Sequence, residues 1–213
     1  MKLDAVITGD VVGSTQMTKD ERDTMLAILR RMPELLSPIC EMRLEMFRGD
    51  GFQIGTADAK MSLRVAIAIR ANMRSFKFSN GNGQWDARLS IGIGSVDYES
   101  DTLASSDGEA FRLSGHGLDG MTFERLVVET PWAEMNDELR VSTAFADNLI
   151  SSWSPSQSRI IFQNLLSEKT HAEIGRELGV SRQMVDKSLN TSRDYLIKMY
   201  LDRFKTLINH NSL

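Results

Sequence analysis

The sequence predicts an α+β protein in which a mixed sheet-and-helix domain precedes an all-α unit. Short apolar runs with strand character alternate with helical apolar patterns up to about residue 130. A Ser-Pro-Ser segment at 154–156 then marks a boundary, and only helical patterns follow it. The predicted organisation is therefore a domain over 1–130, a connecting helix over 131–153 and a helical domain over 154–213.

The first elements follow from apolar spacing and from capping residues. A buried strand is expected over 3–10. Thr18 and Glu21 form a capping-box pattern that opens a helix, which Pro33 should kink and Pro38 should end.

A hairpin follows over 42–56, because two apolar runs flank a Gly-Asp-Gly turn. The remaining expected segments are a helix over 59–76, a strand over 85–96, an acidic loop over 97–107, a short helix over 108–116, a strand over 125–129 and a helix over 131–153. This order predicts a sheet with helices on one face.

The composition limits the possible classes of protein. Hydrophobic residues make up 41% and charged residues 25% of the 213 residues, and no apolar run approaches the roughly 20 residues of a membrane span. Cys40 is the only cysteine, which excludes an internal disulfide and multi-cysteine zinc motifs. The first residues enter a strand pattern without a signal-peptide core. We therefore expect a cytoplasmic protein with no membrane contact.

Charge is distributed unevenly along the chain. Residues 154–213 hold 9 basic and 6 acidic residues, a net charge of +3, whereas residues 1–153 hold 16 and 23, a net charge of −7. An acidic body with a basic tail favours a tail that binds nucleic acid.

Two aspartates stand at turns that could share one edge of the sheet. Asp10 ends the first predicted strand, and Asp50 lies between Gly49 and Gly51 at the hairpin tip. If the strands are neighbours, the two carboxylates repel each other and a divalent cation is the usual counter-charge. The alternative is two turn aspartates that never meet.

Four segments, in this order, resemble motifs of the class III nucleotidyl cyclases, which share a ferredoxin-like palm core with diguanylate cyclases. They are Gly-Asp-Val-Val-Gly-Ser-Thr at 9–15, Gly-Asp-Gly-Phe at 49–52, Arg-Leu-Ser-Ile-Gly-Ile-Gly at 88–94 and the segment 108–116. The resemblance covers about 130 residues and implies a cyclase-like palm fold there.

The resemblance also implies roles for individual residues. Asp10 and Asp50, with a carbonyl near Val11, would hold two Mg²⁺ ions. Backbone amides entering a helix would bind the triphosphate of a nucleotide. Apart from the resemblance, Arg48 and Arg112 could supply cations at the phosphates, unless they are solvated surface arginines. The expected nucleotide-binding set is Val12, Gly13, Ser14, Thr15, Arg48, Gly49, Gly51 and Arg112.

The sequence departs from the family at three positions. Met46 stands where adenylyl cyclases carry a base-recognising lysine. Arg112 replaces the ribose-binding asparagine, and His116 replaces the arginine that stabilises the transition state. Losing such donors costs orders of magnitude in rate. The pattern therefore predicts a site that can hold a nucleotide but turns it over poorly or not at all.

The segment 170–189 resembles the helix-turn-helix of sigma-factor region 4 and LuxR-like proteins. Thr170 and Ser181 cap its two helices, and Gly179 takes the left-handed turn. The side chains expected to face inward are Ala172, Ile174, Leu178, Val180, Val185 and Leu189. Those expected to face DNA are Arg182, Gln183, Asp186, Lys187 and Asn190. The alternative is a helical hairpin that only packs or dimerises.

The last helical pattern, over 195–208, has an apolar stripe too wide for a lone exposed helix. It could dock on the body or pair with a second copy, and we expect a homodimer. The two-part plan is also similar to the small bacterial SatD family.

We therefore expect a DNA-binding transcriptional regulator with a degenerate nucleotide sensor. One alternative is an active Mg²⁺-dependent nucleotidyl cyclase or oligonucleotide synthase with an altered base pocket. Another is a scaffold whose tail binds a protein.

Overall fold

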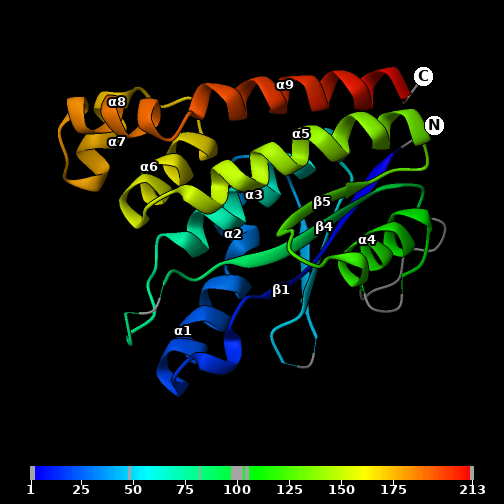
Figure 1. Cartoon of the computed structure of the whole chain (residues 1–213), viewed down its shortest axis with the longest axis horizontal. Coiled ribbons are helices and arrows are strands. Elements are labelled where there is room, and N and C mark those ends of the chain that lie inside the picture. Colours follow the sequence, from blue (N-terminus) through cyan, green and yellow to red (C-terminus); the bar gives the residue numbers. More distant parts are fainter. Residues whose placement is uncertain (1–2, 48, 82, 97–102, 104–105, 212–213) are drawn as a thin grey trace.

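The computed structural model describes residues 3–47, 49–81, 83–96, 103 and 106–211 (Figure 1). Within these residues the strands are β1 (Asp4–Val11), β2 (Arg43–Met46), β3 (Phe52–Thr56), β4 (Ala87–Gly94) and β5 (Leu126–Glu129). They form one sheet in the order β2-β3-β1-β4-β5. All neighbours are antiparallel except β4 and β5, which are parallel. Most of the predicted acidic loop at 97–107 lies outside the described residues, as does Arg48.

The helices account for most of the remaining described chain, so the predicted α+β class is confirmed. They are α1 (Lys19–Arg30), α2 (Met32–Leu36), α3 (Ser62–Arg74), α4 (Glu109–Gly120), α5 (Ala133–Ser152), α6 (Pro155–Leu166), α7 (His171–Leu178), α8 (Arg182–Thr191) and α9 (Asp194–Asn211). Two short 3₁₀ turns are η1 (Ser14–Gln16) and η2 (Ala59–Met61). None of the described helices is long and apolar enough to cross a membrane.

The start of α1 follows the predicted capping box. The Thr18 hydroxyl accepts from the Glu21 amide, and the Thr18 amide donates to the Glu21 carboxylate at 2.9 Å. That amide is the main reason why the pKa of Glu21 falls to about 2. The helix that was expected to kink at Pro33 is instead divided into two helices, α1 and α2. The first helix stops at Arg30, and Pro33 lies in the first turn of α2, where its missing N–H costs nothing.

Helix α3 forms the centre of the core, and almost all its side chains are buried. It packs on the sheet through β1 and β4, and on α5, α6 and α9 on its other side. The buried apolar side chains of the sheet and of α5–α9 belong to one continuous cluster. The helices after residue 154 are therefore fixed to the body through α3.

Helix α4 covers the opposite face of the sheet, which corrects the expectation that all helices share one face. Its backbone lies so close to β4 that a Cβ on Gly92 would come within 2.1 Å of the Ala110 carbonyl oxygen. Gly117 of α4 likewise leaves room for the Ser90 side chain. These glycines allow the helix to sit directly on the strand.

Candidate functional site

The end of β1 and the turn between β2 and β3 lie beside one pocket of about 340 Å³. The antiparallel register pairs Gly9 with Phe52, so the residues just beyond them emerge at the same end of the sheet. As a result, Asp10 and Asp50 both line the pocket, together with Val11, Val12 and Gly13. The remaining lining residues are Arg88, Thr122, Phe123, Glu124 and Arg125.

Arg88 is the counter-ion of Asp10. The register places the two residues directly opposite each other on β1 and β4. The guanidinium binds both carboxylate oxygens, Oδ1 through Nε at 2.9 Å and Oδ2 through Nη2. The hydrogen bond to Asp10 raises the pKa of Arg88, and the charges of Asp10, Asp50 and Asp119 add to it. Arg88 thus neutralises charge that the sequence pattern assigned to a metal ion.

The expected Mg²⁺ set of Asp10, Asp50 and the Val11 carbonyl lies at this pocket, with Asp10 bound to an arginine. Among the described residues, no group of three or more His, Cys, Asp or Glu side chains is placed to hold a metal ion. Each Asp10 oxygen accepts one hydrogen bond from Arg88 and keeps a further lone pair, so a cation there would share the carboxylate with that guanidinium.

The segment expected to bind phosphate does not run directly into a long helix. Gly13 has a φ of 69°, and the next three residues form only the 3₁₀ turn η1. The Val12 amide donates to the Asp86 carbonyl at 2.9 Å, so it is already engaged. Ser14 and Thr15 belong to η1, and α1 starts only after Thr18. The helix N-terminus that the resemblance implies is therefore absent at residues 12–15.

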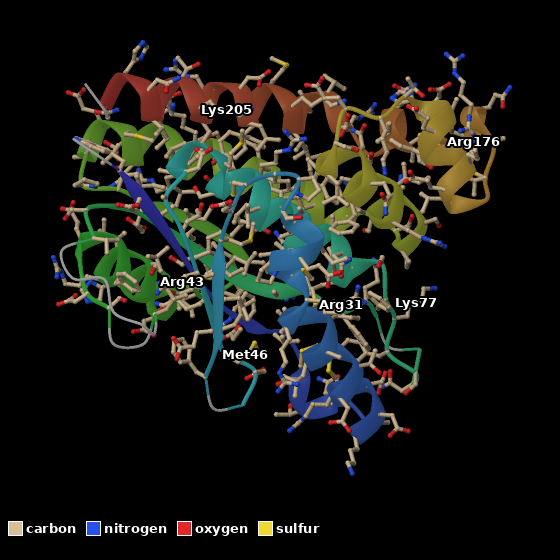
Figure 2. All side chains as sticks on the ribbon, turned by 180° about the vertical axis from the view of Figure 1, so that it is seen from behind. Arg31, Arg43, Met46, Lys77, Arg176 and Lys205 are labelled. Carbon is tan, nitrogen blue, oxygen red and sulfur yellow. The ribbon has the colours of Figure 1, made fainter. Side chains whose placement is uncertain are left out.

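The other residues named by the resemblance are dispersed. Gly49, with a φ of 89°, and Gly51 shape the hairpin turn that carries Asp50. Arg112 lies on α4, where it donates to Asp107 at 3.2 Å, and does not line the pocket. Met46 ends β2, partly buried against the core, and Figure 2 shows it close to the hairpin tip. His116 is exposed on α4.

The far wall of the pocket, residues 122–125, was not predicted from the sequence. Glu124 folds back to accept from the amides of Thr122 and Phe123, at 2.9 and 3.0 Å. This local turn leaves the Phe123 ring 95% exposed at the pocket. Arg125 brings a second guanidinium to the wall. A loop between a helix and a strand gave no periodic signal that could have marked these residues.

A buried ion network lies behind the pocket. Arg70 is fully buried and binds Asp86 through Nε and Nη2, both at 2.9 Å, and Asp147 through Nη1 at 2.6 Å. Burial opposes its charge, but the two carboxylates keep the pKa of Arg70 above its usual value. Arg74 adds a further bond to Asp86 at 2.8 Å. Despite burial, these arginines hold the pKa of Asp86 below its usual value.

The network continues from the pocket to the C-terminal helices. Arg125, on the pocket wall, lies 3.9 Å from Asp86. Arg74 donates to the Trp153 carbonyl at 3.1 Å, and the Trp153 indole N–H donates to the Ser192 carbonyl, also at 3.1 Å. Ser192 is the C-cap of α8. A chain of polar contacts therefore joins the pocket to the end of this helix.

Helices α7 and α8 form a tight corner on α6. Thr170 and Glu173 make a full capping box at α7, and the Ser181 hydroxyl caps α8. Gly179 has a φ of 69°, as its predicted left-handed position requires. The backbone of residue 180 approaches α7 closely at Gly175. A Cβ at this position would lie only 2.7 Å from the Val180 carbonyl oxygen, so the close approach requires glycine.

The outer face of α8 carries most of the residues predicted to read bases. Arg182, Gln183, Lys187 and Asn190 are exposed, while Val185, Ser188 and Leu189 are buried on the opposite face. The fifth predicted residue, Asp186, is half-buried and bound to His171 of α7. Its second oxygen lies 3.6 Å from Arg182 Nε.

Two predicted inward residues of this unit face solvent. Ala172 is exposed, and Val180 is 36% exposed rather than wedged between the helices. The reason is that backbone atoms fill the corner. The Val180 amide donates to the Gly175 carbonyl at 2.8 Å, which turns the Val180 side chain outward.

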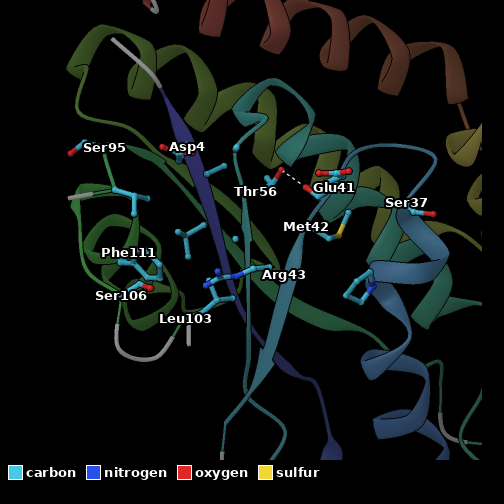
Figure 3. A pocket seen from close by; sticks show the side chains of 16 residues that line it. Asp4, Ser37, Glu41, Met42, Arg43, Thr56, Ser95, Leu103, Ser106 and Phe111 are labelled. Atoms are coloured by element: carbon cyan, nitrogen blue, oxygen red, sulfur yellow. Dashed lines mark hydrogen bonds between the residues drawn. The ribbon is translucent and has the colours of Figure 1, made fainter. Parts of the chain in front are cut away.

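A larger cavity of about 660 Å³ lies at the other end of β1 (Figure 3). Asp4, Arg43 and Phe111 line it, and on one side the Thr56 hydroxyl donates to the Glu41 carbonyl at 2.8 Å. None of the residues predicted to bind metal, nucleotide or DNA contributes to its wall.

No protein-family model matches the chain, and no curated protein matches it. Similar solved structures include the active GGEEF domain of a diguanylate cyclase from Vibrio cholerae, with a TM-score of 0.41 and 19% identity over 55% of this chain and 75% of that one. Two structures of a bacterial light-regulated adenylyl cyclase give TM-scores of 0.39 and 0.36 at 12% identity. Both matches cover 59% of this chain. The first covers 42% of the cyclase chain and the second covers 74% of it.

Proposed function

We propose that the chain is a DNA-binding regulator in which α7 and α8 act as a helix-turn-helix and the sheet domain senses a nucleotide. The observation that carries the proposal is that α8 has one polar, exposed side and one apolar, buried side. Arg182, Gln183, Lys187 and Asn190 are exposed along one side, and the apolar side is buried. Any surface helix carries polar side chains on its free face, so the support for DNA binding comes from which side chains these are.

The exposed side chains have the chemistry of base-edge and phosphate contacts. Arginine recognises guanine O6 and N7, and glutamine and asparagine recognise adenine N6 and N7. Lys187 suits a backbone phosphate. Asp186 takes a different role from the one expected, because its bond to His171 ties α8 to the start of α7. We assign it to positioning Arg182 rather than to a base.

The pocket beside Asp10 and Asp50 is the proposed sensor site. Arg88 and Arg125 supply cations for phosphate groups, and the exposed Phe123 ring offers a surface on which a base can stack. The lining also carries the carboxylates of Asp10, Asp50 and Glu124, so a phosphate there needs either an added cation or the release of Arg88 from Asp10. A ligand that pulls Arg125 away from Asp86 would alter the contacts that lead through Trp153 to the end of α8.

Fluorescence anisotropy with random and promoter-derived duplexes tests the proposal. Arg182→Ala should weaken specific binding by about 1–3 kcal/mol, and Lys187→Ala should weaken binding to all sequences and lower the salt slope by about 1. Arg30→Ala, which removes an exposed arginine from the last turn of α1, is the matched control. If the wild-type chain binds no duplex in a salt-dependent way, the DNA-binding proposal fails.

An active phosphoryl-transfer enzyme is the second candidate, favoured by the shared pocket of Asp10 and Asp50. It predicts release of pyrophosphate from a nucleoside triphosphate with Mg²⁺ or Mn²⁺, lost in Asp10→Ala. The engagement of Asp10 by Arg88 argues against it. No turnover of any common nucleoside triphosphate, by the wild type or by Arg88→Ala, would remove this candidate.

A further inference from the structure

Helices α5 and α9 present an uncovered apolar surface. The two helices run antiparallel, because Thr143 of α5 bonds Tyr200 of α9 at 2.5 Å and Glu138 binds Arg203 further along (Figure 1). Five large apolar side chains of these helices face solvent. They are Val141 (55% exposed), Phe145 (72%), Tyr195 (55%), Leu196 (38%) and Met199 (64%), which we call the α5–α9 patch.

The members of the patch lie together. The register set by Thr143 and Tyr200 places Phe145 across the seam from Leu196 and Met199. The inner stripe of α9, which includes Ile197 and Phe204, is already docked on the body, so the patch is a second apolar face of the same helix. This face has no partner among the described residues.

We propose that the α5–α9 patch is the interface of a two-fold symmetric homodimer. From the usual sizes of these side chains, it exposes on the order of 500 Å² per copy, comparable to the largest apolar patch of a typical protein surface, which is often functional. Two copies would together bury about 1,000 Å² before any polar rim is counted, near the lower limit for a specific interface. The area therefore suits a second copy of the same surface.

The charges around the patch also favour an identical partner. Glu138 is paired with Arg203 at 2.6 Å, Asp137 with Arg140 at 3.6 Å and Asp194 with Lys198 at 2.8 Å. Each of these three pairs is neutral within one chain. An anionic membrane or a strongly charged partner would find no excess of opposite charge here, whereas a second copy brings a matching neutral, apolar face.

The position of the patch gives the dimer a consequence for the proposed DNA contact. Tyr195, Leu196 and Met199 lie in the first turns of α9, which follows α8 directly. A two-fold axis at the patch would fix the separation of two α8 helices, as paired half-sites on a duplex require. The interface itself does not rest on DNA binding.

Sedimentation velocity and light scattering on the full chain, without DNA, test the dimer. The wild type should sediment as a dimer. Phe145→Asp combined with Met199→Asp should raise the dimer Kd by at least about 30-fold, as expected for loss of central apolar contacts. The control, Thr206→Asp with Asn209→Asp, adds the same two charges to exposed positions near the end of α9 and should remain dimeric. Circular dichroism checks that both variants fold.

A second measurement locates the axis. In a Cys40→Ser background, Met199→Cys should form a disulfide between copies under mild oxidation, and Thr206→Cys should not. A monomeric wild type at all accessible concentrations, or a patch variant that stays dimeric, overturns the proposal. So does a monomer that sediments with phosphatidylserine vesicles through the patch, because the face would then be a membrane surface. DNA binding, measured separately, can succeed or fail independently of these results.

Discussion

Replacing Arg70 by methionine should strongly destabilise the protein. The side chain is fully buried, and its guanidinium makes three short hydrogen bonds to Asp86 and Asp147 and a fourth to Ser151 at 2.9 Å. Methionine has a similar length but no charge, so Arg70→Met leaves two carboxylates desolvated with fewer partners. The loss therefore exceeds that of an ordinary surface ion pair.

The size of the stability loss depends on the hydrogen-bond partners that Asp86 and Asp147 keep in Arg70→Met. Asp86 keeps Arg74 at 2.8 Å, and Asp147 keeps the Arg125 amide at 2.8 Å. Removing one partner of a buried pair typically costs about 3–5 kcal/mol. For a chain of this size that is a fall in Tm of roughly 10 °C. Thermal and urea denaturation followed by circular dichroism at neutral pH measure it.

The effect should depend on pH in a defined direction. In the native protein the pKa of Asp86 lies below its ordinary value of 3.8, so the ion network stabilises the fold above that value and loses strength as pH falls through the lowered pKa. The gap in unfolding free energy between wild type and Arg70→Met should therefore narrow on acidification below about pH 4. A loss under about 1 kcal/mol at neutral pH, or a gap that widens in acid, would refute this reasoning.

Two further substitutions test the pocket and the α7–α8 corner. Arg88→Ala should free Asp10 and create Mn²⁺ binding that is detectable by electron paramagnetic resonance, whereas the wild type should show none at the same metal concentration; equal signals from both proteins would contradict the role of Arg88 as counter-ion. Gly175→Ala should cost about 1–3 kcal/mol because its Cβ would lie 2.7 Å from the Val180 carbonyl oxygen. Gly115→Ala on α4, with open space around its Cβ, is the control and should be neutral or slightly stabilising.

The sequence by itself determined the local features of this protein. The capping boxes at Thr18 and Thr170, the cap at Ser181 and the left-handed Gly179 all lie where their side chains and neighbours predict. The 42–56 hairpin and the α+β class follow in the same way. These features depend on contacts within a few residues, which a single sequence records directly.

Only the tertiary structure decided which distant residues meet. The register of β1 on β4 set Arg88 against Asp10 and gave the carboxylate a guanidinium as its counter-ion. The docking of α5 and α6 on α3 buried Arg70, which the sequence placed only within a helix expected over 59–76. The sequence gives the chemistry of each side chain directly. Charge neutralisation and burial depend on residues that are distant in the sequence and meet only in the folded protein.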